Sequence, residues 1–119
     1  MKLLLDNLPR SLAAQRGTLA ACLEAMNSAL PLSAVYLFGS HARGEARPDS
    51  DVDLCLVAHG AEQQLKTAQR FRRAMRPLRG KPAFTLVPIA PARLAEKRAS
   101  GDHFFGTVLN EGVLIAAQD

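Results

Sequence analysis

Two apolar segments that lie close together in the sequence, residues 34–38 and 51–58, constrain the fold of this chain more than any other feature. Both have the length and composition of β-strands. Residues 39–50, which connect them, leave room for only a short helical turn and a polar loop. A parallel crossover needs a dozen or more residues and usually a full helix. We therefore predict that the two strands pair in an antiparallel direction.

Helical periodicity is found on both sides of this strand pair. Apolar residues recur at helical spacing over residues 9–30, which Pro31 ends, and again between Gly60 and Pro77. In the second of these helices, the apolar stripe is predicted to consist of Leu65, Ala68, Phe71, Met75 and Leu78.

The remaining chain completes a small α+β pattern. A third strand is predicted at residues 83–89, followed by short helices at 91–99 and 103–110. The apolar stretch 113–117 packs either on its own sheet or on another chain. The predicted fold class is α+β, with a small mixed β-sheet and helices packed on it, and one domain spans residues 1–119.

Composition argues against a membrane-spanning chain and against a metal site built on cysteines. Of the 119 residues, 48% are hydrophobic and 22% are charged, as in soluble globular domains, and no apolar run is long enough to span a bilayer. Cys22 and Cys55 lack the spacing of metal ligands, and both fall in apolar patterns. We expect them to be reduced core residues of a cytoplasmic protein.

The positive charge is concentrated in one part of the chain. Fifteen Lys and Arg residues against eleven Asp and Glu residues give a net charge of +4. Seven cations lie between residues 61 and 81, opposed only by Glu62: Lys66, Arg70, Arg72, Arg73, Arg76, Arg79 and Lys81. This cluster is either a solvated helix face or a patch for RNA, a phosphate-rich substrate or an acidic partner.

The strand pair also carries the residues with the strongest chemical signal. Gly39 and Ser40 follow the first strand, where a tight turn can direct backbone N–H groups and a hydroxyl at phosphate. Asp51 and Asp53 alternate at the start of the second, so both carboxylates project from one face, with Cα atoms about 6.6–6.8 Å apart. Such a pair is suited to one or two Mg²⁺ (or Mn²⁺) ions. Arg43 or Arg47 could neutralise phosphate charge, and His41 either contacts phosphate or is a surface residue of the turn.

The order and spacing of these residues resemble the nucleotidyltransferase superfamily that includes DNA polymerase beta, and in particular the minimal nucleotidyltransferases of prokaryotes. The pattern of that family, Gly-Ser followed by Asp-x-Asp, falls on Gly39, Ser40, Asp51 and Asp53, and the dense match covers residues 35–57. The neighbouring residues Ala42, Arg43, Gly44, Ser50 and Leu54 are also similar to the family.

This resemblance implies a polymerase beta-like fold in which the third strand lies beside the second. It also implies Mg²⁺-dependent transfer of a nucleoside monophosphate from an NTP, with ATP as the first candidate, to a hydroxyl of a protein or small-molecule acceptor. Asp51 and Asp53 would be the catalytic metal ligands, and Gly39, Ser40 and Arg43 would bind the phosphates. Members of the family often pair with a HEPN-domain protein, so the antitoxin of such a toxin–antitoxin pair is one possible role.

One position departs from the family pattern. The family has a third carboxylate on the third strand, where this chain has Thr85, and no acidic residue lies between Glu62 and Glu96. Glu96 or a carboxylate from a partner could substitute. Three alternatives follow: an active transferase, a catalytically impaired nucleotide-binding or scaffold subunit that binds a partner protein, and an RNA-binding module built on the basic helix.

Overall fold

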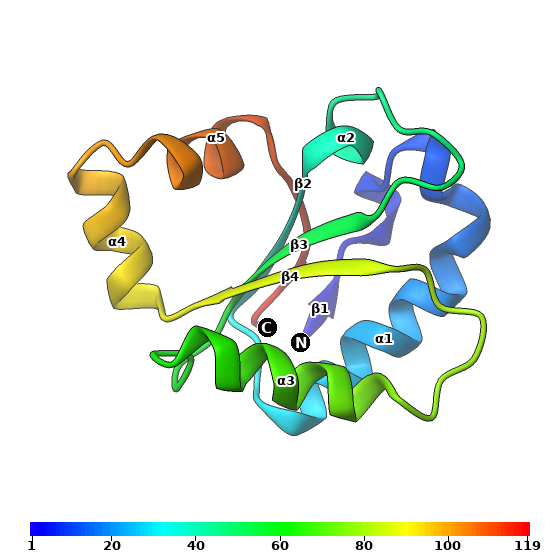
Figure 1. Cartoon of the computed structure of the whole chain (residues 1–119), viewed down its shortest axis with the longest axis horizontal. Helices are drawn as coiled ribbons and strands as arrows, with labels where there is room; N and C mark the ends of the chain where they lie inside the picture. Colours follow the sequence, from blue (N-terminus) through cyan, green and yellow to red (C-terminus); the bar gives the residue numbers. More distant parts are fainter.

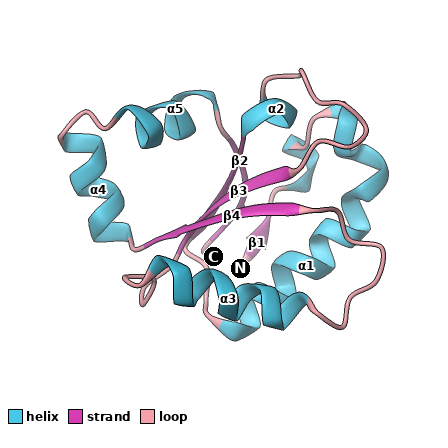
Figure 2. Cartoon of the chain, viewed as in Figure 1, coloured by secondary structure: helices cyan, strands magenta, loops and turns pink.

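Five strands form one mixed sheet through the centre of the molecule (Figures 1 and 2). The computed structural model describes residues 1–119. The strands are β1 Lys2–Leu3, β2 Ala34–Phe38, β3 Val52–Val57, β4 Phe84–Ile89 and β5 Val113–Ala117, in the order β1-β5-β2-β3-β4. β2 and β3 are antiparallel, and β4 lies beside β3 in a parallel direction, so both predicted pairings are confirmed.

Helical segments connect these strands and follow the sequence pattern closely. They are η1 Leu5–Asn7, η2 Arg10–Gln15, α1 Arg16–Ala29, α2 Gly39–Ala42, α3 Gln64–Met75, α4 Pro91–Ala99 and α5 His103–Glu111, where η denotes a 3₁₀ helix. The single helix predicted over residues 9–30 is therefore divided, because its first turns have 3₁₀ geometry, which is frequent at helix N-termini.

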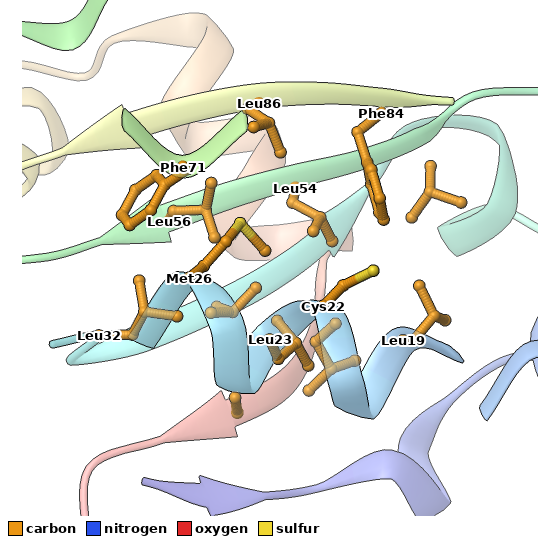
Figure 3. Packing of buried hydrophobic residues seen from close by; sticks show 14 of the residues in the cluster. Leu19, Cys22, Leu23, Met26, Leu32, Leu54, Leu56, Phe71, Phe84 and Leu86 are labelled. Carbon is orange, nitrogen blue, oxygen red and sulfur yellow. The ribbon is translucent and has the colours of Figure 1, made fainter. Parts of the chain in front are cut away.

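The two faces of the sheet are covered unequally. Strand alternation places Leu37, Leu54 and Leu86 on one face, where α1 and α3 pack, and this face holds a cluster of twenty buried residues (Figure 3). The opposite face of the sheet lies toward α4 and α5, and the cluster on that side has five buried residues: Cys55, Val57, Ile89, Phe105 and Val108. The main core thus lies on the α1–α3 side, and the face that carries Asp53 is less densely covered.

The predicted apolar stripe of α3 was wrong at one position. Leu65 is 75% exposed, whereas Thr67, Phe71 and Met75 are buried. These three residues follow one another at intervals of four and define the face that packs on the sheet. The Thr67 side chain is accommodated there because its hydroxyl donates a hydrogen bond to the Gln63 carbonyl at 2.9 Å.

The last strand settles an alternative that the sequence left open. β5 pairs with β2 on one side and with β1 on the other, so residues 113–117 pack on their own sheet. β1 was not predicted, because two residues are too few to show a period.

None of the helices has both the length and the apolar character that a membrane span requires.

Both cysteines are free and buried, as the sequence predicts. Burial raises the pKa of the Cys55 thiol to about 12, and it also raises that of Cys22, where nearby Lys81 acts in the opposite direction. The Cys55 thiol is therefore protonated at neutral pH and behaves as a small apolar side chain.

The packing predicts a clear contrast between two leucines. Leu54→Ala removes a side chain that is 1% exposed in the larger core, and we expect a loss of about 2–5 kcal/mol in the free energy of unfolding. Leu65→Ala, the control at an exposed helix position, should change it by about 0.5 kcal/mol or less. Urea unfolding followed by circular dichroism measures both, and equal losses would contradict the packing described.

Candidate active site

The antiparallel pairing of β2 and β3 brings a glycine turn against a carboxylate. Phe38 lies opposite Asp53 in the ladder, so Gly39, the next residue, turns away beside the Asp53 side chain. Gly39 has φ of 76°, a conformation that L side chains rarely adopt, and a Cβ there would overlap the Asp53 carboxylate. Glycine is thus required at this position both for backbone geometry and for space.

A cavity of about 500 Å³ opens at this contact. Its lining includes four of the predicted site residues, which are Gly39, Ser40, Arg43 and Asp53. The opposite wall comes from α5, which lies next to α2 in Figure 1 and contributes His103, Phe104, Thr107, Val108 and Glu111. Sequence reasoning did not assign these α5 residues to the site, because no local pattern indicates that a helix more than sixty residues further along the chain faces the Gly-Ser turn.

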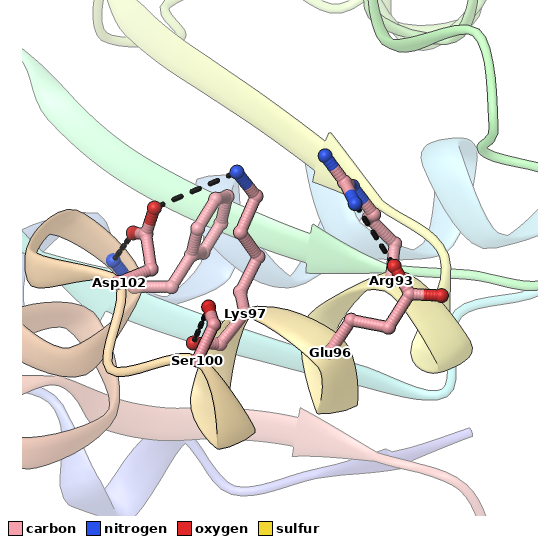
Figure 4. Close-up of polar contacts among 6 residues, drawn as sticks. Arg93, Glu96, Lys97, Ser100 and Asp102 are labelled. Atoms are coloured by element: carbon pink, nitrogen blue, oxygen red, sulfur yellow. Dashed lines mark hydrogen bonds and ion pairs between the residues drawn. The ribbon is translucent and has the colours of Figure 1, made fainter.

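A side-chain cap holds the start of this wall in place. Asp102, the residue before α5, accepts a hydrogen bond from the Phe105 backbone N–H at 2.9 Å (Figure 4). That bond is the main cause of a lowered pKa at the Asp102 carboxyl, and Lys97 Nζ, 3.5 Å from the carboxylate, lowers the pKa further. α4 and α5 are therefore joined at their shared corner.

Asp51 lies just outside this cavity. The β3 ladder begins at Val52, whose N–H donates to the Ala83 carbonyl at 2.9 Å, so Asp51 is the exposed residue that precedes the strand. Because Asp51 precedes the strand, the ladder fixes the position of Asp53 but not the direction of the Asp51 side chain.

The carboxylates of Asp51 and Asp53 suit a divalent cation that is also coordinated by the phosphates of a nucleotide. Mg²⁺ is usually held by one or two carboxylates together with substrate phosphates and water. Asp51 and Asp53 supply two carboxylates, and no group of three or more His, Cys, Asp or Glu residues is placed to hold a metal ion. The chain therefore offers part of a coordination shell, and phosphate oxygens would complete it.

The two candidate arginines differ in position. Arg43 lines the cavity beside Ser40, although its guanidinium also pairs with Glu45 at 3.2 Å on the exposed surface. Arg47 lines a separate cavity behind the loop, so it is not brought together with Gly39 and Asp53. Of the two, only Arg43 lines the cavity that also contains Gly39 and Asp53.

His41 is buried, so its interpretation as a surface residue of the turn was wrong, and the phosphate contact stays a prediction. It is 5% exposed, with Nδ1 2.8 Å from Ser11 Oγ and Nε2 3.4 Å from the Ser50 carbonyl. Because a carbonyl can only accept, the contact at Nε2 requires a proton on that nitrogen, and Nδ1 faces the Ser11 hydroxyl. His41 thus connects the N-terminal segment to the residue that precedes Asp51.

Comparison with known proteins identifies the family. A family model described as a nucleotidyltransferase domain matches residues 19–100, more than half of the chain. The chain belongs to the nucleotidyltransferase domain family. Domains of this family generally use divalent metals, which agrees with the donor set at Asp51 and Asp53.

A solved structure shows the same fold. It is a protein from Sulfolobus solfataricus that is provisionally assigned as a nucleotidyltransferase, with 23% sequence identity and a TM-score of 0.50. The match covers 87% of this chain and 84% of that one. No curated protein matches the sequence significantly.

β4, which the sequence predicted as the third strand, carries no acidic residue. Thr85 is the register partner of Asp53 on the parallel strand β4, and its side chain is exposed. The position next to Asp53, on the side away from Gly39, is therefore neutral.

Gly39→Ala tests the crowded turn. We expect a loss of about 1–3 kcal/mol in the free energy of unfolding from the positive φ alone, with displacement of Asp53 in addition. Gly17→Ala, in α1 with no atom within 4 Å of the new methyl group, should be neutral or stabilising. Thermal unfolding compares the two variants, and equal stability would contradict the described contact.

His41→Ala tests the connection to the Asp51 loop. Loss of both hydrogen bonds leaves the Ser50 carbonyl and the Ser11 hydroxyl without this partner, which should cost about 1–3 kcal/mol of stability. Hydrogen exchange should also accelerate at the amides of the 44–50 loop. His59→Ala, an exposed histidine, is the control and should change neither quantity.

Proposed function

We propose that this chain transfers a nucleoside monophosphate from an NTP, with ATP as the first candidate, to a hydroxyl of a protein or small-molecule acceptor. One observation carries the proposal: the carboxylate of Asp53 lies against the Gly39 turn, in the same cavity as Ser40 and Arg43. A metal ligand at Asp53 and phosphate donors at Ser40 and Arg43 would lie within reach of one triphosphate, which supports the proposal.

Each residue has a distinct part in the proposed reaction. Asp51 and Asp53 would hold Mg²⁺, which neutralises charge on the triphosphate and on the departing pyrophosphate. Ser40 and Arg43 would bind the outer phosphates, because hydroxyl and guanidinium groups donate to phosphate oxygens. The α5 wall, including Thr107, would limit the space open to the nucleotide and exclude water.

Calorimetric titration with ATP in the presence and absence of Mg²⁺ tests the proposal. Asp53→Asn should weaken Mg²⁺-dependent ATP binding at least tenfold, or about 1.4 kcal/mol, because the amide is a poorer ligand for a hard cation. The control is Asp49→Asn, an exposed residue of the neighbouring loop that lies outside the cavity and should bind ATP like the parent. Parental binding by the Asp53 variant would contradict the assignment.

The second candidate function is a catalytically impaired nucleotide-binding or scaffold subunit. The observation that favours it is the neutral Thr85 beside Asp53. The two functions differ in turnover: a transferase releases pyrophosphate when an acceptor is present, whereas a scaffold binds ATP and Mg²⁺ without consuming them. The resemblance alone supports a further part of the proposal, a HEPN-domain partner for which this chain is the antitoxin. Co-purification of the two proteins would test this pairing.

A further inference from the structure

Phe104 is a large aromatic residue that the fold leaves half-exposed. Its side chain is 45% accessible, and the only other large hydrophobic residue that is exposed is Leu65, near the start of α3. A single exposed hydrophobic side chain needs no function to explain it. The surroundings of Phe104 therefore decide what the residue can do.

Phe104 lies between two cavities. It lines the cavity that contains Asp53, and also a second cavity of about 590 Å³ whose apolar lining includes Val87 and Ile89. Asp53 shares its sheet face with these two residues, because its register partner on β4 is Thr85 and side chains alternate along a strand. The two cavities therefore follow one another along the same face, with Phe104 in the wall of both.

Two other aromatic rings hold Phe104 in position. The Phe38 ring lies 5.5 Å from it with the planes at 87°, and the Phe105 ring lies 5.0 Å from it at 86°. Both contacts have the edge-to-face geometry that aromatic pairs prefer. Phe38 is also the ladder partner of Asp53, and residues directly opposite each other share a face of the sheet. Phe38 therefore links the Phe104 ring to the position of Asp53.

A triphosphate bound as proposed above meets an apolar surface in one direction. With its outer phosphates at Ser40 and Arg43 and its metal at Asp53, the nucleoside extends from Asp53. Toward the start of β3 it would approach Asp51, which is exposed and negatively charged. Further along β3 it would reach the open ring of Phe104. A flat and largely apolar base is favoured on the ring and not beside the carboxylate.

His103 is the other ring on this wall of the cavity that contains Asp53. The further cavity that His103 lines is formed by the α4–α5 corner, with Asp102 and Gly106. A base on His103 would therefore lie over this corner and not on the apolar surface of the second cavity. Phe104 is the ring that joins the cavity of Asp53 to that surface.

We propose, on the basis of the proposed function, that Phe104 forms a base-binding subsite, on which the nucleobase of the NTP stacks while the triphosphate lies at Ser40, Arg43 and Asp53. Stacking needs only a π-face, which every base has, so the subsite tolerates different bases. The ring moves no proton and binds no metal. Its part is to hold the nucleoside, and with it the α-phosphate, in a fixed position.

Tripolyphosphate separates the contribution of the base from that of the phosphates. It carries the phosphate chain of ATP without a nucleoside, and calorimetric titration in the presence of Mg²⁺ compares the two ligands. Phe104→Ala should weaken ATP binding about 5–150-fold, the range found when a stacking aromatic is removed, and should leave tripolyphosphate binding within about twofold of the parent. Asp53→Asn should weaken both ligands, because both depend on the metal.

Two further variants control for packing and folding. Phe104→Tyr keeps the aromatic ring and should bind ATP like the parent. Leu65→Ala removes the other exposed hydrophobic side chain and should change the binding of neither ligand. Thermal unfolding shows that each variant is folded. A purely structural role of Phe104 would change ATP and tripolyphosphate binding in the same proportion.

Nuclear magnetic resonance gives a second measurement, on the parent protein itself. In protein labelled at phenylalanine, the ring signal of Phe104 is identified by its loss in Phe104→Tyr. ATP with Mg²⁺ should shift this signal, because the ring current of a stacked base acts on it, whereas tripolyphosphate should leave it in place. A Phe104 signal that does not move when ATP is bound would overturn the inference.

The outcomes separate this inference from the proposed function. Absence of Mg²⁺-dependent binding of both ligands by the parent protein would defeat the proposed function itself. Binding of both ligands that is lost in Asp53→Asn, with parental ATP affinity in Phe104→Ala or with equal losses for the two ligands in that variant, would overturn the inference while the phosphate site stands.

Discussion

The contact between the Gly39 turn and the Asp53 carboxylate is the constraint on which the rest of the site depends. It exists because Phe38 and Asp53 are partners in the antiparallel ladder, which fixes where the chain leaves β2 relative to the side chains of β3. A shift of one residue in this register would turn Asp53 into the α1–α3 core and expose Leu54. The large buried cluster on that face therefore secures the position of a polar residue on the other.

Local sequence signals accounted for most of the fold and for half of the site. Alternation and helical periodicity gave the central strands, the antiparallel pair and the order of helices, since each depends on residues near in sequence. The α5 wall, the β1 strand and the burial of His41 could not be predicted, because they arise from contacts between segments far apart in the chain. Leu65 shows the related difficulty that an apolar residue near a helix start need not face the core.

Side chains of both charges lie around the end of β3 that carries Asp53. The carboxylates of Asp51 and Asp53 lie at one end of β3, and cations flank them on both sides, with Arg43 after β2 and Arg72 at the edge of β4. Anionic molecules could thus meet a metal held between them without crossing a region of negative potential.

The unequal covering of the sheet has a dynamic consequence. α4 and α5 connect the edge strand β4 to β5 across the face of the sheet, and only five buried residues hold this crossing segment, against twenty beneath α1 and α3. Segments with few buried contacts open locally at a lower free energy than the whole molecule unfolds. We therefore expect α4 and α5, which carry the α5 wall of the cavity, to open at a lower free energy than the strands that carry Gly39 and Asp53.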